Sequence, residues 1–330
     1  MKSGSEIIFL FRGGFIMIDV TALGELLIDF TPYGTADDGC HLFGRNPGGA
    51  PANLLATVSR YGGKTALITK VGSDIFGDFL IDVLRKNKIS TEGVVRDGIH
   101  NTTLAFVELN AEGDRSFSFY RRFGADIFLT PEEVNSELIR DSKVFHFGSL
   151  SLTNEPAVSA TDCALKTAKD SGCVITYDPN YRAALWPNET IAAKKIREYV
   201  PFAEIIKVSR EEAQMITGIE SPEKAAKEIC GMGPKIALVT DGGNGVTYAT
   251  QGCVRHVPAF AVKAEDTTGA GDIFFGSFIS SLLKLEKPKE EIQIFEIESC
   301  VERAVKTAGL STTKKGAITS IPNEKEVDKL

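Results

Sequence analysis

A short run of small residues ends in an acidic residue in the last quarter of the sequence. It reads Asp266-Thr-Thr-Gly-Ala-Gly-Asp272, and the apolar stretch from Ile273 to Leu283 that follows suits a buried helix. Gly269, Ala270 and Gly271 would leave backbone N–H groups uncovered at the start of that helix, where free donors and the helix dipole favour an anion. A phosphoryl group in transfer would be stabilised there.

The same helix start offers a general base. The helix dipole favours the ionised form of a carboxylate in the first turn, so Asp272 is a candidate to accept a proton from an attacking hydroxyl. Glycine-rich helix starts are common, and these residues alone leave open a second interpretation, in which the glycines form a tight turn and Asp272 is an electrostatic cap.

The bulk properties of the chain exclude several classes of protein. Its 330 residues carry a net charge of −7, with acidic and basic residues intermixed, so we expect no nucleic-acid partner. No apolar run reaches the length of about 18 residues that a membrane-spanning helix needs, so we expect no membrane association. The 6 cysteines form no C-x-x-C pair and no zinc spacing, which indicates reduced thiols in the cytoplasm.

The elements that must position this chemistry alternate along the chain, which is typical of parallel strands joined by crossover helices. We predict strands at residues 19–24, 65–71, 144–147, 174–177, 205–208 and 236–240, and helices at 51–61, 76–86, 157–171, 210–217 and 223–230. This order predicts one α/β domain over residues 17–330, with a doubly wound, mostly parallel sheet flanked by helices.

Two stretches interrupt this pattern, and we predict that they form a small β-sheet lid with strands at about 27–46 and 102–122. The second stretch alternates polar and apolar residues around a turn at 110–114, which predicts a hairpin. Such a sheet would cover a cleft or pair two copies of the chain. Residues 1–16 lack the pattern of a signal peptide, and we expect them to be an extension that precedes the natural start at Met17.

Two motifs resemble those of a known family. Residues Asp266 to Asp272 resemble the D-T-T-G-A-G-D motif of the ribokinase-like (PfkB) carbohydrate kinases at every position, and Asn46-Pro-Gly-Gly-Ala-Pro-Ala-Asn53 is similar to that family's di-glycine motif. The resemblance runs from about Val20 to Pro322. It is closest to fructokinases, through the segments at residues 24–30, 145–152, 177–182 and 207–212. It implies the ribokinase-like fold, with Asp272 as the catalytic base and Gly269, Ala270 and Gly271 as an anion hole.

The resemblance also implies binding residues for the sugar. These are Asp29, Gly48, Gly49, Asn53, Arg121 and Arg182. Asp29 ends an apolar strand, where an unpaired carboxylate is costly, and a carboxylate can accept hydrogen bonds from adjacent hydroxyls. For the two arginines the alternative is a solvated surface salt bridge.

Further residues would bind the nucleotide and two cations. The resemblance assigns the nucleotide to Lys207, Ser209, Glu212, Thr240, Gly242 and Gly245, and a monovalent cation to Asp266, Thr268, Gly316 and Ser320. Glu212 would act on Mg²⁺ through water, although Ser209 stands where many relatives have Asn. Val305 is a second departure, near the adenine. The implied cofactors are ATP, Mg²⁺ and K⁺, and hard oxygen ligands suit both cations.

These observations predict an ATP-dependent kinase that phosphorylates the 6-hydroxyl of D-fructose. A 2-keto-3-deoxygluconate kinase and a ribokinase remain alternatives, because a few polar contacts decide which sugar is bound. A non-catalytic sugar-binding regulator on the same fold is an alternative from a different class. The sequence contains no G-x-x-x-x-G-K-[ST] motif, and its first strand-to-helix turn has no G-x-G-x-x-G motif, which argues against a P-loop kinase and a dinucleotide-dependent oxidoreductase. We also expect a homodimer through the lid.

Overall fold

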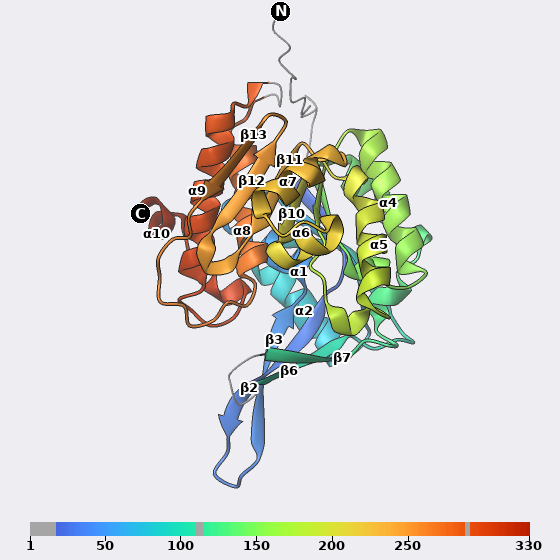
Figure 1. The fold of residues 1–330 in the computed structure, drawn as a ribbon. Helices are drawn as coiled ribbons and strands as arrows, with labels where there is room; N and C mark the ends of the chain where they lie inside the picture. The colour runs from blue at the N-terminus through green and yellow to red at the C-terminus, as the bar shows by residue number, and fades with distance from the viewer. Residues whose placement is uncertain (1–17, 110–114, 288–290) are drawn as a thin grey trace, which may run out of the picture.

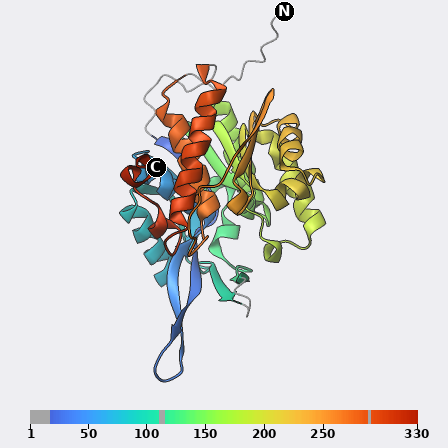
Figure 2. The ribbon, with the colours of Figure 1, turned by 60° about the vertical axis from the view of Figure 1, so that its left-hand side comes forward.

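A computed structural model describes residues 18–109, 115–287 and 291–330. The predicted extension at residues 1–16, the expected start at Met17 and the turn at 110–114 lie outside the described residues. Within the described ranges, the chain forms a nine-stranded sheet between two layers of helices and a separate four-stranded sheet that projects from one end (Figures 1 and 2).

The central sheet has the order β13-β12-β11-β10-β9-β8-β1-β4-β5. Its strands are β1 (Ile18–Leu23), β4 (Thr65–Gly72), β5 (Ile89–Asp97), β8 (Ser142–Gly148), β9 (Val174–Asp178), β10 (Ile205–Ser209), β11 (Ile236–Thr240), β12 (Val246–Thr250) and β13 (Cys253–Val257). The seven strands β11, β10, β9, β8, β1, β4 and β5, which are adjacent in this order, pair in parallel. β12 pairs antiparallel with β11, and β13 pairs antiparallel with β12. The predicted mostly parallel sheet is confirmed, and β5, β12 and β13 are additions to the six predicted strands.

Helices cover both faces of this sheet. One face packs against α1 (Ala50–Arg60), α2 (Ile75–Lys86), α8 (Ala270–Lys284) and α9 (Ile294–Ser311), and the other against α3 (Ser136–Arg140), α4 (Ala157–Ser171), α5 (Glu189–Tyr199), α6 (Arg210–Thr217) and α7 (Pro222–Gly231). The short α10 (Glu324–Asp328) lies at the carboxyl end. Successive residues of a strand enter opposite cores: in β11, Leu238 joins the first and Val239 the second. This explains why the strands are almost continuously apolar.

The small sheet has the order β3-β2-β6-β7 and consists of β2 (Leu27–Thr35), β3 (His41–Gly48), β6 (Leu104–Leu109) and β7 (Arg115–Tyr120). The predicted pairing within 102–122 is confirmed, because β6 and β7 are antiparallel with Leu104 opposite Tyr120. Phe30 stacks on Phe106 at 4.9 Å and meets Phe76 of α2 edge-on at 5.8 Å between ring centroids. These aromatic contacts fix the base of the lid against the main domain.

Short 3-10 turns complete the connections, at Ala125–Phe128, Pro131–Glu133, Leu150–Leu152, Ala183–Leu185, Val200–Phe202, Gly242–Asn244 and Ile318–Ser320. In the described part of the chain, no helix is long and apolar enough to span a membrane. The loops after β1, β9, β10 and β11 all leave the carboxyl edge of the parallel strands, where the starts of α1 and α8 also lie. That edge is the usual place for a ligand site in a doubly wound sheet.

Candidate active site

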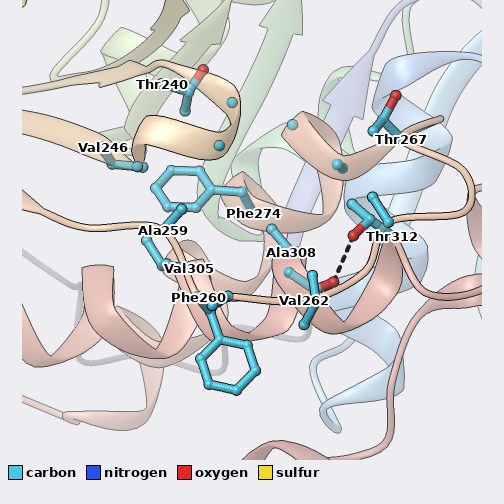
Figure 3. Close-up of a pocket in the computed structure, with 18 residues that line it drawn as sticks. Thr240, Val246, Ala259, Phe260, Val262, Thr267, Phe274, Val305, Ala308 and Thr312 are labelled. Carbon is cyan, nitrogen blue, oxygen red and sulfur yellow. Dashed lines mark hydrogen bonds between the residues drawn. The ribbon is translucent and has the colours of Figure 1, made fainter.

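Two cavities meet at the start of α8. The larger, of about 410 Å³, is shown in Figure 3 and is lined by Thr240, Gly242, Gly245, Ala270, Gly271, Phe274 and Val305 among others. The smaller, of about 80 Å³, is lined by polar residues, namely Glu25, Asp29, Asn53, Asn180, Arg182, Thr268 and Asp272, together with Gly49 and Gly269 among others. The first turn of α8 therefore separates the two cavities, with Ala270 and Gly271 on one side and Gly269 and Asp272 on the other.

The small residues at this helix start are required by their surroundings. Gly269 has φ +74°, in the left-handed region, and a Cβ there would lie 2.5 Å from Ala317 Cβ. A Cβ on Gly271 would lie 2.9 Å from Lys207 Nζ. The left-handed Gly269 has no space for a side chain, and a side chain on Gly271 would displace the Lys207 ammonium. The role of this turn as an anion hole stays a prediction.

Asp272 is buried in this turn and hydrogen-bonded on both carboxylate oxygens. Asn53 Nδ2 lies 2.8 Å from Oδ2, and Asn180 Nδ2 lies 3.3 Å from Oδ1. Burial and the charge of Asp178 raise the pKa of Asp272 to about 6, against the opposite effects of Lys207 and Asn53. The sequence argument from the helix dipole omitted this burial, but a pKa of about 6 still leaves the carboxylate mostly ionised at pH 7.

Four of the predicted sugar residues, Asp29, Gly49, Asn53 and Arg182, line the smaller cavity. Burial raises the pKa of Asp29 to about 6, and Arg182 opposes the rise. Asn53 Oδ1 is buried without a hydrogen-bond partner among the described residues, so it is an acceptor available to a ligand. Gly48 is packed against the Asp29 carboxylate, which leaves no space there for a side chain.

Arg121 is placed differently from the expectation. It is 4% exposed and absent from the lining of the smaller cavity. Its Nε donates to Asp126 Oδ2 at 2.7 Å, and its terminal nitrogens donate to Thr153 Oγ1 and to the Leu150 carbonyl, each at 2.9 Å. It follows the end of β7, and the β7 residue that lines the cavity is Phe119. The surface salt bridge is therefore replaced by a buried ion pair, and the predicted contact of Arg121 with the sugar stays a prediction.

The predicted nucleotide residues divide into two groups. Thr240, Gly242 and Gly245 line the larger cavity, as does Val305, whereas Lys207, Ser209 and Glu212 do not. Glu212 Oε2 accepts from the Ser209 backbone N–H at 2.7 Å, and Oε1 accepts from the Tyr181 N–H at 2.6 Å. Both carboxylate oxygens of Glu212 therefore bind backbone, one within the capping box of α6 and the other in the loop after β9.

Lys207 lies between the two groups. Its Nζ is 2.7 Å from Asp178 Oδ2 in a buried ion pair, and it also lies beside Gly271 at the start of α8. Burial would lower the pKa of Lys207, but the nearby carboxylates of Asp178, Glu212 and Asp272 outweigh it and raise the pKa. Lys207 therefore carries a positive charge next to the backbone that separates the cavities.

The residues predicted to hold a monovalent cation come from two segments that the structure brings together. Asp266 Oδ1 accepts from the Thr268 N–H at 2.8 Å, and Oδ2 accepts from the Gly316 N–H at 2.9 Å. The Ser320 hydroxyl donates to the Ala317 carbonyl at 2.8 Å. The loop before α8 and the loop after α9 thus meet at Asp266, and the monovalent-cation site stays a prediction.

Three polar or charged residues of the site were not predicted from the sequence. Glu25 lines the smaller cavity and accepts from the Ala50 N–H at 2.9 Å, and burial raises its pKa to about 7. Asn180 contacts Asp272, and Asp178 pairs with Lys207. All three stand at or just beyond the end of a buried strand, within segments already noted for their resemblance. Polar residues at the ends of buried strands could therefore have identified these three site residues in the sequence.

Comparisons with known proteins agree with this geometry. Residues 17–324 match the pfkB family of carbohydrate kinases. Probable fructokinase-5 of Arabidopsis thaliana is 41% identical over 318 residues, which cover 94% of this chain and 96% of that protein. The structure of a fructokinase with bound ATP from Xylella fastidiosa has a TM-score of 0.87 and 30% identity, covering 94% of this chain and 97% of that one. A double-mutant fructokinase from Vibrio cholerae O395, bound to fructose, ADP and potassium ion, has a TM-score of 0.85 and 30% identity. The match covers 96% of this chain and 99% of that one.

Proposed function

The chain belongs to the pfkB family of carbohydrate kinases, and from this premise we propose that it is an ATP-dependent fructokinase that phosphorylates the 6-hydroxyl of D-fructose. The proposal rests on the start of α8. There the buried Asp272 carboxylate faces the smaller, polar cavity, and the Gly271 backbone faces the larger cavity. The relatives at 41% identity over 94% of the chain are named fructokinases, which favours fructose over ribose and 2-keto-3-deoxygluconate.

In this proposal the sugar occupies the smaller cavity. Asp29, Asn53 and Arg182 bind its hydroxyls, and the free Asn53 Oδ1 accepts one of them. Asp272 then takes the proton of the attacking hydroxyl as the phosphoryl group moves in line towards the sugar. The backbone of Gly269, Ala270 and Gly271 and the charge of Lys207 stabilise the negative charge on that group.

The lid sheet covers the sugar. Asp29 of β2 and Phe119 of β7 both reach the cavity from the lid, so closing the lid over fructose would bring these side chains against it. Exclusion of water at this point limits hydrolysis of ATP.

We propose ATP, Mg²⁺ and K⁺ as cofactors. Mg²⁺ bound with ATP supplies positive charge against the phosphate oxygens. The role of Glu212 towards Mg²⁺ remains a prediction, because its two oxygens bind backbone N–H groups. Asp266, Thr268, Gly316 and Ser320 would hold K⁺, and the meeting of their two segments at Asp266 supports this assignment. If activity in K⁺-free buffer equals activity in K⁺, the site is not used.

We also propose that two copies pair through the lid. Tyr33, Leu42 and Phe43 lie on the projecting β2–β3 hairpin and are 79%, 42% and 46% exposed, an unusual amount of apolar surface for a free hairpin. Light scattering after size exclusion would show a dimer, and the Tyr33→Ser/Phe43→Ser variant would be a monomer. A monomeric parent chain would contradict this part of the proposal.

The test of function is ATP consumption with Mg²⁺ and K⁺ against fructose, ribose, 2-keto-3-deoxygluconate and adenosine. The proposal expects a strong preference for fructose, with phosphorus coupled to the 6-carbon in the NMR spectrum of the product. A different preferred sugar would leave the kinase intact and overturn the choice of substrate. Absence of any phosphorylated product, with fructose still bound, would favour a sugar-binding regulator.

A further inference from the structure

The loop after β9 places an asparagine in a left-handed conformation beside Asp272. Asn180 has φ +47°, one of three non-glycine residues with positive φ among those described, and its Nδ2 lies 3.3 Å from Asp272 Oδ1. Asparagine tolerates this region better than most residues, but an extended conformation remains more favourable for a free chain. Such backbone conformations persist where surrounding contacts impose them.

Both neighbours of Asn180 are held by hydrogen bonds. The Pro179 carbonyl accepts from the Ser149 N–H at 3.0 Å. The Tyr181 N–H donates to Glu212 Oε1 at 2.6 Å, and the Glu212 side chain is itself buried and fixed to the start of α6. The backbone on each side of Asn180 is therefore anchored to the main domain, which accounts for the imposed conformation.

Two amides thus hold the two oxygens of Asp272 from different elements. Asn53, on α1, donates to Oδ2 at 2.8 Å, and Asn180, in the loop after β9, donates to Oδ1 at 3.3 Å. This arrangement fixes the plane of the carboxylate and leaves lone pairs on each oxygen for a substrate hydroxyl. Four charged side chains also act on Asp272. The carboxylates of Asp178 and Asp29 favour its protonated form, and the cations of Lys207 and Arg182 favour its ionised form.

We propose that Asn180 is a positioning residue that orients Asp272 for proton transfer, and that Glu212 fixes Asn180 by binding the Tyr181 N–H. This inference rests on the proposed function, since it requires Asp272 to act as the base. The buried carboxylate of Glu212 then holds the loop that carries Asn180, separately from any effect on Mg²⁺.

The proposal predicts a particular kinetic change. Loss of the amide removes a donor to the ionised carboxylate, so Asp272 should hold its proton to higher pH. The acid limb of the kcat profile should then move upward by roughly half a pH unit. The kcat at neutral pH should fall about tenfold because the base is less well oriented. The KM for the sugar should change little, because the proposed sugar ligands Asp29, Asn53 and Arg182 are unchanged.

The decisive variant is Asn180→Gly, which keeps the positive φ accessible and removes only the side chain. Its matched control is Lys88→Gly, since Lys88 has φ +58° at an exposed position far along the chain from the site. A second variant, Asn180→Asp, preserves the size and the left-handed conformation but replaces the donor with a carboxylate beside Asp272. It should lower kcat at pH 7 further than Asn180→Gly does.

All four proteins are compared by kcat, KM and pH profile, using the sugar that the parent chain phosphorylates fastest. The expected result is a lowered kcat and a raised acid limb for both Asn180 variants, with Lys88→Gly unchanged. A kcat within twofold of the parent, an unmoved acid limb, or an increase confined to KM would each overturn the proposal. A failure of the proposed function would appear separately, in the parent chain's own substrate panel.

Discussion

Lys207 Nζ lies 2.7 Å from Asp178 Oδ2, in an ion pair whose side chains are only 7% and 2% exposed. The pair joins the last residue of β9 to the middle of β10 and places the ammonium beside Gly271 of α8. One buried charge pair of the central sheet therefore lies against the start of α8. Its two members have unequal roles, because only Lys207 lies beside the proposed path of the phosphoryl group.

Replacement of Lys207 by Met should destabilise the fold. The apolar side chain fills the space but leaves the Asp178 carboxylate buried without its cation, which costs about 3–5 kcal/mol. Urea unfolding would measure the loss, and Lys207→Met/Asp178→Asn should recover most of the stability without recovering activity. If the double variant were as active as the parent, Lys207 would have no role at the phosphoryl group.

Replacement of Arg121 by Met should also act on stability. Its guanidinium neutralises the buried Asp126 and binds the Leu150 carbonyl, so its loss should cost about 3 kcal/mol. The KM for fructose should stay within about twofold, because Arg121 does not line the sugar cavity. The neighbouring exposed Arg122, changed to Met, is the control. An unchanged stability with a strongly raised KM would restore the contact predicted from the sequence.

Glu25 should make stability depend on pH. Burial raises its pKa to about 7 from an ordinary value of 4.5, so the folded protein keeps this proton when the unfolded chain has lost it. The contribution is present below pH 4.5 and is lost as pH rises through about 7.

The Glu25→Gln variant cannot ionise and retains an acceptor for the Ala50 N–H. It should therefore be more stable than the parent at pH 8, by on the order of 2 kcal/mol, and no more stable at pH 4. Thermal unfolding at the two pH values measures this, with the exposed Glu92→Gln as control. An equal difference at both pH values would show that the effect is one of packing.

Local patterns in the sequence predicted the elements that are long, apolar and periodic. The helix at Arg210–Thr217 is found with the predicted bounds, and the helix start at Gly269 to Asp272 is found at the edge of the sheet. The antiparallel strands β12 and β13 have five residues each, and they were missed because so few residues carry little periodicity. β12 is fully buried, whereas β13 is partly exposed at the edge of the sheet.

Residues whose position depends on distant partners could not be placed from the sequence. The direction of Arg121 is decided by Asp126 and Thr153, and the left-handed Asn180 is imposed by Ser149 and Glu212. Neither the contacts of Arg121 nor those around Asn180 can be predicted from the local sequence pattern. The physical reason is that side-chain direction beyond the end of a strand depends on tertiary contacts.

The central claim is that Asp272 removes the proton from the sugar hydroxyl while the start of α8 binds the phosphoryl group. Single-turnover transfer from ATP to fructose by Asp272→Asn, with the Kd for fructose measured on the same protein, tests it most directly. The account predicts a rate lowered by about 10²–10⁴-fold, the usual contribution of a general base, and a Kd within a few fold of the parent. A rate within tenfold of the parent at unchanged Kd would contradict it.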